Sequence, residues 1–148
     1  MRKPGFRDGY FALRLYELRR EEELRRARDM VGRDVFQLSW DELRAMLEPG
    51  HPKNAHLQQV VGYWELAASL VVRGLLHPDV YLDACDEGLF TYAVLEEHLP
   101  KIRDLRPTFL AKTEALLQEH PRIKGRLMEI RKRIFAARKE GRPNVVRD

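Results

Sequence analysis

The sequence predicts an all-α fold, a single-domain bundle of five or six helices with short connections marked by prolines. Three observations predict it. Stretch 60–76 is the most apolar in the chain, and its polar residues Glu65, Ser69 and Arg73 recur every four positions, which gives a helix one narrow polar stripe. Prolines separate the segments that have helical periodicity. No segment alternates convincingly between apolar and polar residues, as a half-buried strand would.

The apolar stretch 60–76 is interpreted as a buried core helix and not as a membrane span. A span needs ~20 consecutive apolar residues, and here Glu65 and Arg73 interrupt a shorter run. At ~1.5 Å per residue the stretch covers only about 25 Å as a helix. Each charge inside a span would also cost roughly 2.5–3.5 kcal/mol. No transmembrane segment is therefore predicted.

Two helices are expected before this stretch. Residues 8–31 have an imperfect apolar face beside many Arg and Glu residues, and Gly32 is expected to end that helix. Ser39 then opens a short second helix, because Glu42 lies three positions later and completes a capping box. The pair Pro49-Gly50 ends it.

Four prolines predict boundaries after the central stretch, at positions 78, 100, 107 and 121, because proline is tolerated in a first helical turn but not in a helix interior. Short helices are expected between them, the first ending at Gly88. Residues 122–140 form the last predicted helix. Its apolar residues follow heptad spacing, which permits either docking on the bundle or pairing with a second copy. They are Ile123, Leu127, Ile130, Ile134 and Ala137.

Length and composition favour one domain, residues 1–140, followed by a short polar tail, residues 141–148. A chain of 148 residues with 44% hydrophobic residues can bury a substantial core and is not disordered in bulk. The single cysteine allows no intramolecular disulfide, and the basic N-terminus has no apolar run behind it that would make a secretory signal. We expect a cytoplasmic protein.

Charge is distributed unevenly along the chain. Residues 122–148 contain ten Lys or Arg against three acidic residues, whereas from Glu65 to Glu97 the one basic residue is Arg73. An acidic middle is thus followed by a basic end.

The central stretch also carries a family resemblance. Tyr63-Trp64-Glu65-Leu66, Arg73-Gly74-Leu75 and Pro78-Asp79, with Tyr92 and Pro100-Lys101-Ile102 downstream, resemble a bacterial family of small helical proteins of unknown function. The resemblance covers about residues 57–110. It implies a helical fold and transfers no activity and no site.

The sequence offers no pattern typical of a metal or cofactor site. The carboxylates of Asp79, Asp83, Asp86 and Glu87 would project from one helix, and ligands for a hard cation must converge. No His-x-x-x-His spacing is present, and the two Glu-x-x-His pairs that a di-iron bundle needs are not both found. Cys85 beside two acids is typical of a small core residue, since nearby carboxylates favour the neutral thiol. We therefore expect no metal, no cofactor and no catalytic residue, although an enzyme is not excluded.

The polar stripe, Glu65, Ser69 and Arg73, has two interpretations. It is either the solvent edge of a core helix, or it faces a groove in which Glu65 and Arg73 bracket a polar ligand.

The basic end carries the strongest functional signal. Clustered Lys and Arg are typical of phosphate-binding surfaces, but this segment has no aromatic residues interleaved on its basic side for stacking bases. The alternatives are packing on the acidic middle of the same chain or of a partner, and contact with anionic lipid. The candidate basic surface comprises Arg122, Lys124, Arg126, Arg131, Lys132, Arg133, Arg138, Lys139 and Arg142.

Together these features favour a non-enzymatic helical interaction or scaffold protein that self-associates or joins a protein complex. The alternative is a nucleic-acid-binding protein that uses the last helix. A third possibility is a small-ligand or enzyme site near Glu65 and Arg73.

Overall fold

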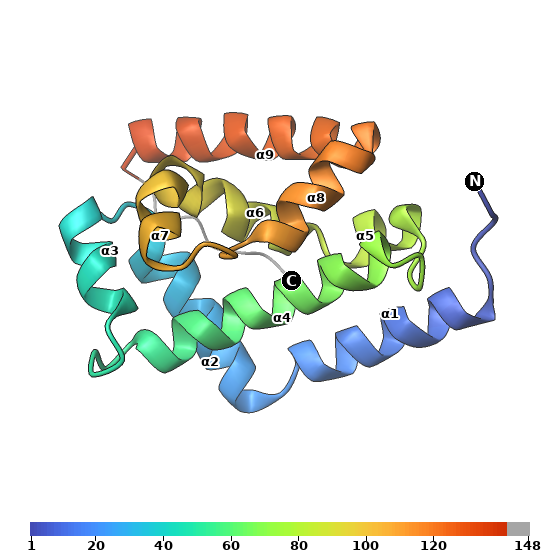
Figure 1. Ribbon diagram of the computed structural model, residues 1–148, viewed down its shortest axis with the longest axis horizontal. Coiled ribbons are helices and arrows are strands. Elements are labelled where there is room, and N and C mark those ends of the chain that lie inside the picture. The colour runs from blue at the N-terminus through green and yellow to red at the C-terminus, as the bar shows by residue number, and fades with distance from the viewer. Residues whose placement is uncertain (142–148) are drawn as a thin grey trace.

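A computed structural model describes residues 1–141 of the protein, which form nine α-helices and no strand (Figure 1). A π-helical turn, Val31–Val35, follows α2, and a 3-10 turn, Glu96–His98, precedes α7. For these residues the all-α class is confirmed, whereas the expected number of five or six helices is wrong. Residues 142–148 of the predicted tail lie outside the described part of the chain. The helices are α1 (Phe6–Arg19), α2 (Glu22–Met30), α3 (Trp40–Leu47), α4 (Asn54–Val72), α5 (Pro78–Ala84), α6 (Asp86–Leu95), α7 (Leu99–Leu105), α8 (Ala111–Glu119) and α9 (Pro121–Lys139).

The single helix expected over residues 8–31 is two helices. The break falls at Glu21, whose side chain accepts hydrogen bonds from the backbone amides of Glu23 (3.2 Å) and Leu24 (3.1 Å) and so caps α2. Gly32 does not end α2 as expected, because it lies buried inside the π-helical turn that continues it.

Gly88 was expected to end a helix, and this prediction is wrong. α5 ends at Ala84, Cys85 adopts a non-helical φ of −132°, and Gly88 sits in the first turns of α6. A Cβ built on Gly88 would lie 3.0 Å from Tyr81 Oη and 3.1 Å from Trp64 Cε3. Glycine is therefore used here for close packing.

The capping box at the start of α3 is confirmed. The amide of Glu42 donates to Ser39 Oγ (3.3 Å), and the amide of Ser39 donates to Glu42 Oε2 (2.9 Å). The central helix α4 begins earlier than the apolar run, at Asn54, whose side chain donates to the carbonyls of Met46 and Leu47 at the end of α3.

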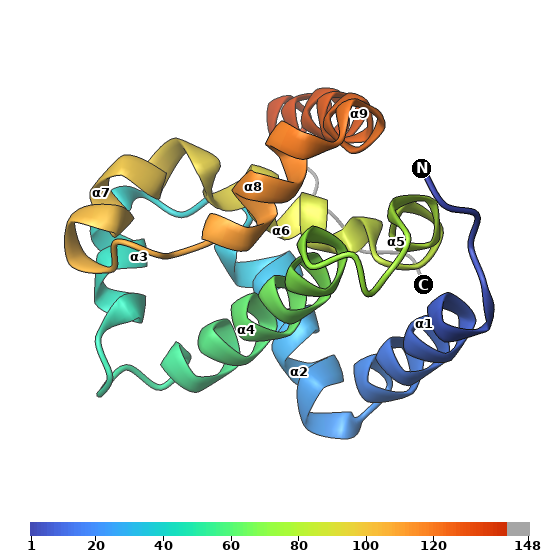
Figure 2. The same cartoon turned by 45° about the vertical axis from the view of Figure 1, so that its right-hand side comes forward.

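α4 runs through the middle of the molecule, packed against α2 on one side and α8 on the other (Figures 1 and 2). Its inner face includes Leu57 and Trp64, which are almost fully buried. Burial on both sides explains why this helix is strongly apolar. None of the described helices is long and apolar enough to cross a membrane.

Two helices lie at the periphery. α1 packs along α5 at one rim, and α9 packs on α6 along the opposite edge (Figures 1 and 2). The predicted apolar stripe of α9 is buried at Ile123, Leu127, Ile130 and Ile134, so this helix docks on the bundle through it.

Candidate functional site

The polar stripe of α4 does not assemble into one site. Both carboxylate oxygens of Glu65 accept hydrogen bonds from the first turn of α8, at the amides of Lys112 (2.9 Å) and Thr113 (2.8 Å) and the hydroxyl of Thr113 (2.6 Å). Ser69 Oγ donates to the carbonyl of Leu66 within α4 (2.8 Å), and Arg73 is exposed at the helix end. Glu65 therefore serves as an inter-helix cap.

α8 needs this cap because its own N-terminus lacks one. The residue at its N-cap, Leu110, has a left-handed φ of 55° and no side-chain hydrogen bond to offer. The helix therefore starts at Ala111, later than the expected Pro107, and its free amides point to the carboxylate of Glu65.

The basic end folds back on the acidic middle of the same chain. Arg122 pairs with Asp79, and Arg126 pairs with Asp86 at 2.6 Å. The hydrogen bonds to Asp86 raise the pKa of Arg126 further above its ordinary value. Two arginines near the start of α9 are thus engaged by α5 and α6.

Two more arginines are engaged farther along α9. Arg131 makes a two-pronged contact with Glu96, at 2.7 and 2.6 Å. Arg138 donates to the carbonyl of Phe36 at 3.0 and 2.7 Å, lies over the Phe36 ring and approaches Glu97 at 3.4 Å. The arginines that make these contacts lie along the edges of the buried stripe. Other residues occupy the outer side of the helix.

The remaining basic residues point outward. Lys124, Lys132, Arg133 and Lys139 are exposed, and Arg142 lies outside the described residues. Two large apolar side chains share the outer side of α9 with them, Met128 and Phe135, which are 52% and 73% exposed. The expectation that no aromatic residue lies among the basic side chains is therefore wrong, because the aromatic ring of Phe135 lies on the side of α9 that Lys132 and Lys139 occupy.

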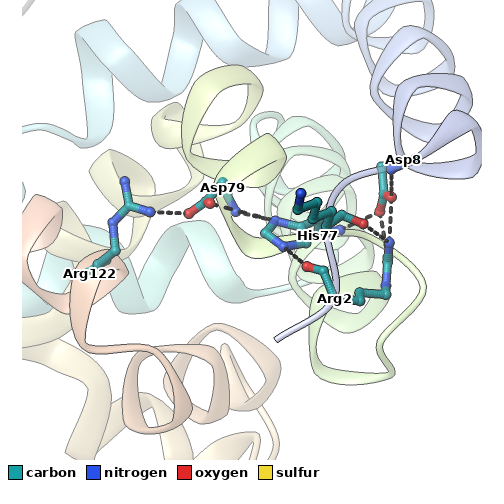
Figure 3. Close-up of polar contacts among 7 residues, drawn as sticks. Arg2, Asp8, His77, Asp79 and Arg122 are labelled. Carbon is teal, nitrogen blue, oxygen red and sulfur yellow. Dashed lines mark hydrogen bonds and ion pairs between the residues drawn. The ribbon is translucent and has the colours of Figure 1, made fainter.

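A polar junction, buried at Asp8 and His77, joins the N-terminal segment, α1, α5 and α9 (Figure 3). At its centre is the carboxylate of Asp8, only 1% exposed. It accepts hydrogen bonds from both terminal nitrogens of Arg2 (2.6 Å each) and from the backbone amides of Gly5 and His77 (2.7 Å each). The hydrogen bonds from the Arg2 guanidinium and these amides hold the pKa of Asp8 far below its usual range.

His77 completes the junction through both of its ring nitrogens. Its Nδ1 accepts the amide of Asp79 (3.1 Å) and caps α5, so the proton resides on Nε2, which donates to the carbonyl of Arg2 (2.7 Å). Asp79 in turn holds Arg122 of α9. The sequence places His77 at a helix end because proline follows it, but it contains no signal for the partners 69 and 75 positions away.

The junction fixes α1 with one face inward and one face outward. Inward, the Tyr63 hydroxyl donates to the carbonyl of Leu15, and Arg19 donates to the carbonyl of Ala84 (3.0 Å). Outward, Phe6, Tyr10 and Leu13 are 91%, 53% and 64% exposed. These three residues, one turn apart, form the apolar stripe of α1. The stripe was not predicted, because Tyr10 was assigned to the apolar face of the expected helix and Phe6 precedes that helix.

The lone cysteine, Cys85, is buried between α5 and α6. Burial raises the pKa of the Cys85 thiol to about 12, so the reactive thiolate is suppressed. Residues 1–141 contain no group of three His, Cys, Asp or Glu side chains that could hold a metal ion. The most buried ion pair, Arg28 with Glu87, joins α2 to α6 at 2.8 and 2.5 Å and serves packing.

One family model matches most of the chain. A family model described as a domain of unknown function, DUF4760, matches residues 6–119. The chain belongs to this family. The DUF4760 match begins at the first residue of α1 and ends at the last residue of α8, so α9 lies beyond it. The resemblance to a family of unknown function is confirmed, over a longer span than residues 57–110. No curated protein and no solved structure matches the chain.

Proposed function

We propose that this protein is a non-enzymatic helical interaction protein that self-associates through the apolar stripe of α1. The observation that supports this most is the outward stripe itself, Phe6, Tyr10 and Leu13, on a peripheral helix that the buried junction holds in one orientation. A stripe of three large side chains exposed side by side is typical of an interaction surface. The lone buried cysteine suits a reducing compartment, and we propose the cytoplasm.

The geometry of the stripe favours a second copy as the occupant. Tyr10 lies at its centre, with Phe6 four positions before and Leu13 three positions after. In an antiparallel two-fold pair of α1 helices, Phe6 of one copy meets Leu13 of the other, and the two Tyr10 rings meet at the axis. The contact is self-complementary and small, so we expect a weak, concentration-dependent dimer.

Sedimentation velocity over a range of protein concentrations tests this proposal. The unmodified chain should shift toward a dimer as concentration rises, and Leu13→Glu should remain monomeric. The matched control is Leu105→Glu, which places the same charge on a leucine of α7 that is 54% exposed and outside the stripe. A monomer at every concentration, or equal loss of dimer in both variants, would contradict the proposal.

The alternative function, nucleic-acid binding by α9, is favoured by the four exposed cations Lys124, Lys132, Arg133 and Lys139. If all four neutralise phosphates, the logarithm of the binding constant should fall against the logarithm of salt concentration with a slope of about −3.6. Fluorescence anisotropy with labelled DNA and RNA across a salt series measures that slope. Self-association through an apolar stripe should depend little on salt.

The third possibility, a ligand or enzyme site near Glu65 and Arg73, has the least support. Glu65 is occupied by α8, and Arg73 is two turns farther along α4, about 12 Å away along the axis.

A further inference from the structure

The outer face of α9 combines exposed apolar side chains with lysines. At 100° per residue, Lys124, Met128, Lys132, Phe135 and Lys139 fall within an arc of about 80° that is centred about 130° around the helix from the buried stripe. Met128 and Phe135 lie at the middle of this arc, and the three lysines border them. We call these five residues the outer face of α9.

Within residues 1–141, the acids of the neighbouring elements that contact α9 pair with its arginines and not with the lysines of this face. Asp79, Asp86 and Glu96 lie on the inner flanks of α9, where arginines engage them. Glu129, on α9 itself, contacts Arg126 at 2.9 Å. The outer face is therefore cationic and apolar, while the flanks are neutralised.

The position of α9 allows a flat surface to reach this face. In Figure 1 the helix runs lengthwise along the upper edge of the molecule, and in Figure 2, where it is seen nearly end-on, it still lies at that edge. Its 19 residues extend about 28 Å. A planar partner can contact the helix along that length.

We propose that the outer face of α9 binds the surface of an anionic phospholipid bilayer. Phe135 and Met128 enter the boundary between headgroups and acyl chains, and the stems of Lys124, Lys132 and Lys139 lie along it so that their ammonium groups reach lipid phosphates. A bilayer accounts for both components of the face. Nucleic acid would engage the lysines but would bring phosphates against two apolar side chains at the centre of the face.

Vesicle co-sedimentation with the full chain tests this inference, using vesicles of phosphatidylcholine alone and of phosphatidylcholine mixed with phosphatidylserine. Binding is expected only to the anionic vesicles and should weaken with salt. Lys132→Gln should lower the partition coefficient about fivefold, the change expected of one cation near an anionic surface. Arg133→Gln is the matched control, because this exposed neighbour carries the same charge about 100° around the helix.

The apolar half of the inference has its own test. Phe135→Ser should lower binding to anionic vesicles by roughly tenfold or more, since an aromatic side chain no longer leaves water. Leu105→Ser, an exposed position on α7, should leave binding unchanged. Both positions are exposed, so both variants should fold, and circular dichroism checks this.

Three outcomes would overturn the inference. The first is no binding to anionic vesicles at low salt, and the second is equal loss in Lys132→Gln and Arg133→Gln. The third is retention of vesicle binding in Phe135→Ser together with tight binding of duplex DNA, which would mean that the face recognises phosphate alone. Leu13→Glu separates this inference from self-association, because it should abolish the dimer and leave vesicle binding intact.

Discussion

Gly88 is the position at which one added carbon atom tests the packing of the core. In Gly88→Ala the new Cβ would lie 3.0–3.2 Å from atoms of Tyr81 and Trp64, which are 0% and 1% exposed and cannot move outward. Overpacking costs roughly 1–3 kcal/mol, and the helix propensity of alanine returns only about 1 kcal/mol. We expect a net loss of up to about 2 kcal/mol in the free energy of unfolding, measured by urea denaturation.

Gly62→Ala is the control for this substitution. Gly62 also lies inside a helix, α4, but is exposed, and a Cβ there would meet nothing within 4 Å. Helix propensity then acts alone and should stabilise the protein by about 0.5–1 kcal/mol. If both variants were stabilised equally, the tight packing around Gly88 would be disproved.

Asp8 should make the stability of the protein depend on pH below 4. Its pKa is about 3.9 in the unfolded chain and is lowered in the folded chain, chiefly by Arg2. Its contribution to stability is therefore complete above the unfolded pKa and is lost as pH falls toward the folded pKa. Asp8→Asn should be less stable than the unmodified protein at pH 7, and the difference should shrink as pH drops below about 4.

Denaturant unfolding between pH 3 and 7 measures this difference. Asp104→Asn, an exposed position, is the control and should change stability by less than about 0.5 kcal/mol at any pH. A difference between Asp8→Asn and the unmodified protein that stays constant down to pH 3 would refute the link to ionisation.

At the scale of the helix, Glu65 shows how one side chain can determine where another helix begins. Glu65→Ala removes three acceptor contacts from the first turn of α8 and leaves its amides without a capping side chain. We expect a loss of about 1.5–3 kcal/mol, the usual range for hydrogen bonds to a charged group. Hydrogen exchange should quicken at Lys112 and Thr113 more than at the amides of α3, which keeps its own capping box. Uniform quickening in both helices would contradict a local role.

The helix ends show which features could be predicted from the sequence and which could not. The capping box of α3 is local, since Ser39 and Glu42 are three positions apart, and it was predicted correctly. The partners of Glu65 are 47 and 48 positions away, so spacing along α4 could reveal the polar stripe but not its use. Gly88 was misplaced for the same reason, because a helix-ending glycine and a close-packed glycine look alike until Trp64 and Tyr81 are placed.

The candidate site was predictable to a similar degree. The uneven charge along the chain indicated that the basic end had an acidic counterpart, and packing on the acidic middle was one of the placements left open. Which arginines pair inward depends on the rotation of α9 about its axis, which the buried stripe sets. The apolar stripe of α1 was missed because exposure depends on tertiary packing, and an exposed and a buried leucine have the same periodicity.

For the whole molecule, the question is whether α9, which lies beyond the DUF4760 match, unfolds with the other helices. Exposed ion pairs such as Arg131 with Glu96 contribute about 0–1 kcal/mol each. Removing the buried side chain of Leu127 should cost about 2–5 kcal/mol, so apolar burial attaches the helix more strongly than charge. Arg131→Gln should therefore change stability by less than about 1 kcal/mol, and Leu127→Ala by several times more.

Because the buried stripe of α9 joins the same core as α4 and α6, we expect one cooperative unfolding transition. Fluorescence of Trp40 in α3 and Trp64 in α4 reports on the body of the protein, and far-ultraviolet circular dichroism reports on all the helices. The two curves should coincide in the unmodified protein and should shift together in Leu127→Ala. If, in Leu127→Ala, the dichroism were lost at a lower denaturant concentration than the tryptophan signal, α9 would unfold independently of the other helices. Its outer face would then be presented by a helix that detaches from the bundle before the rest unfolds.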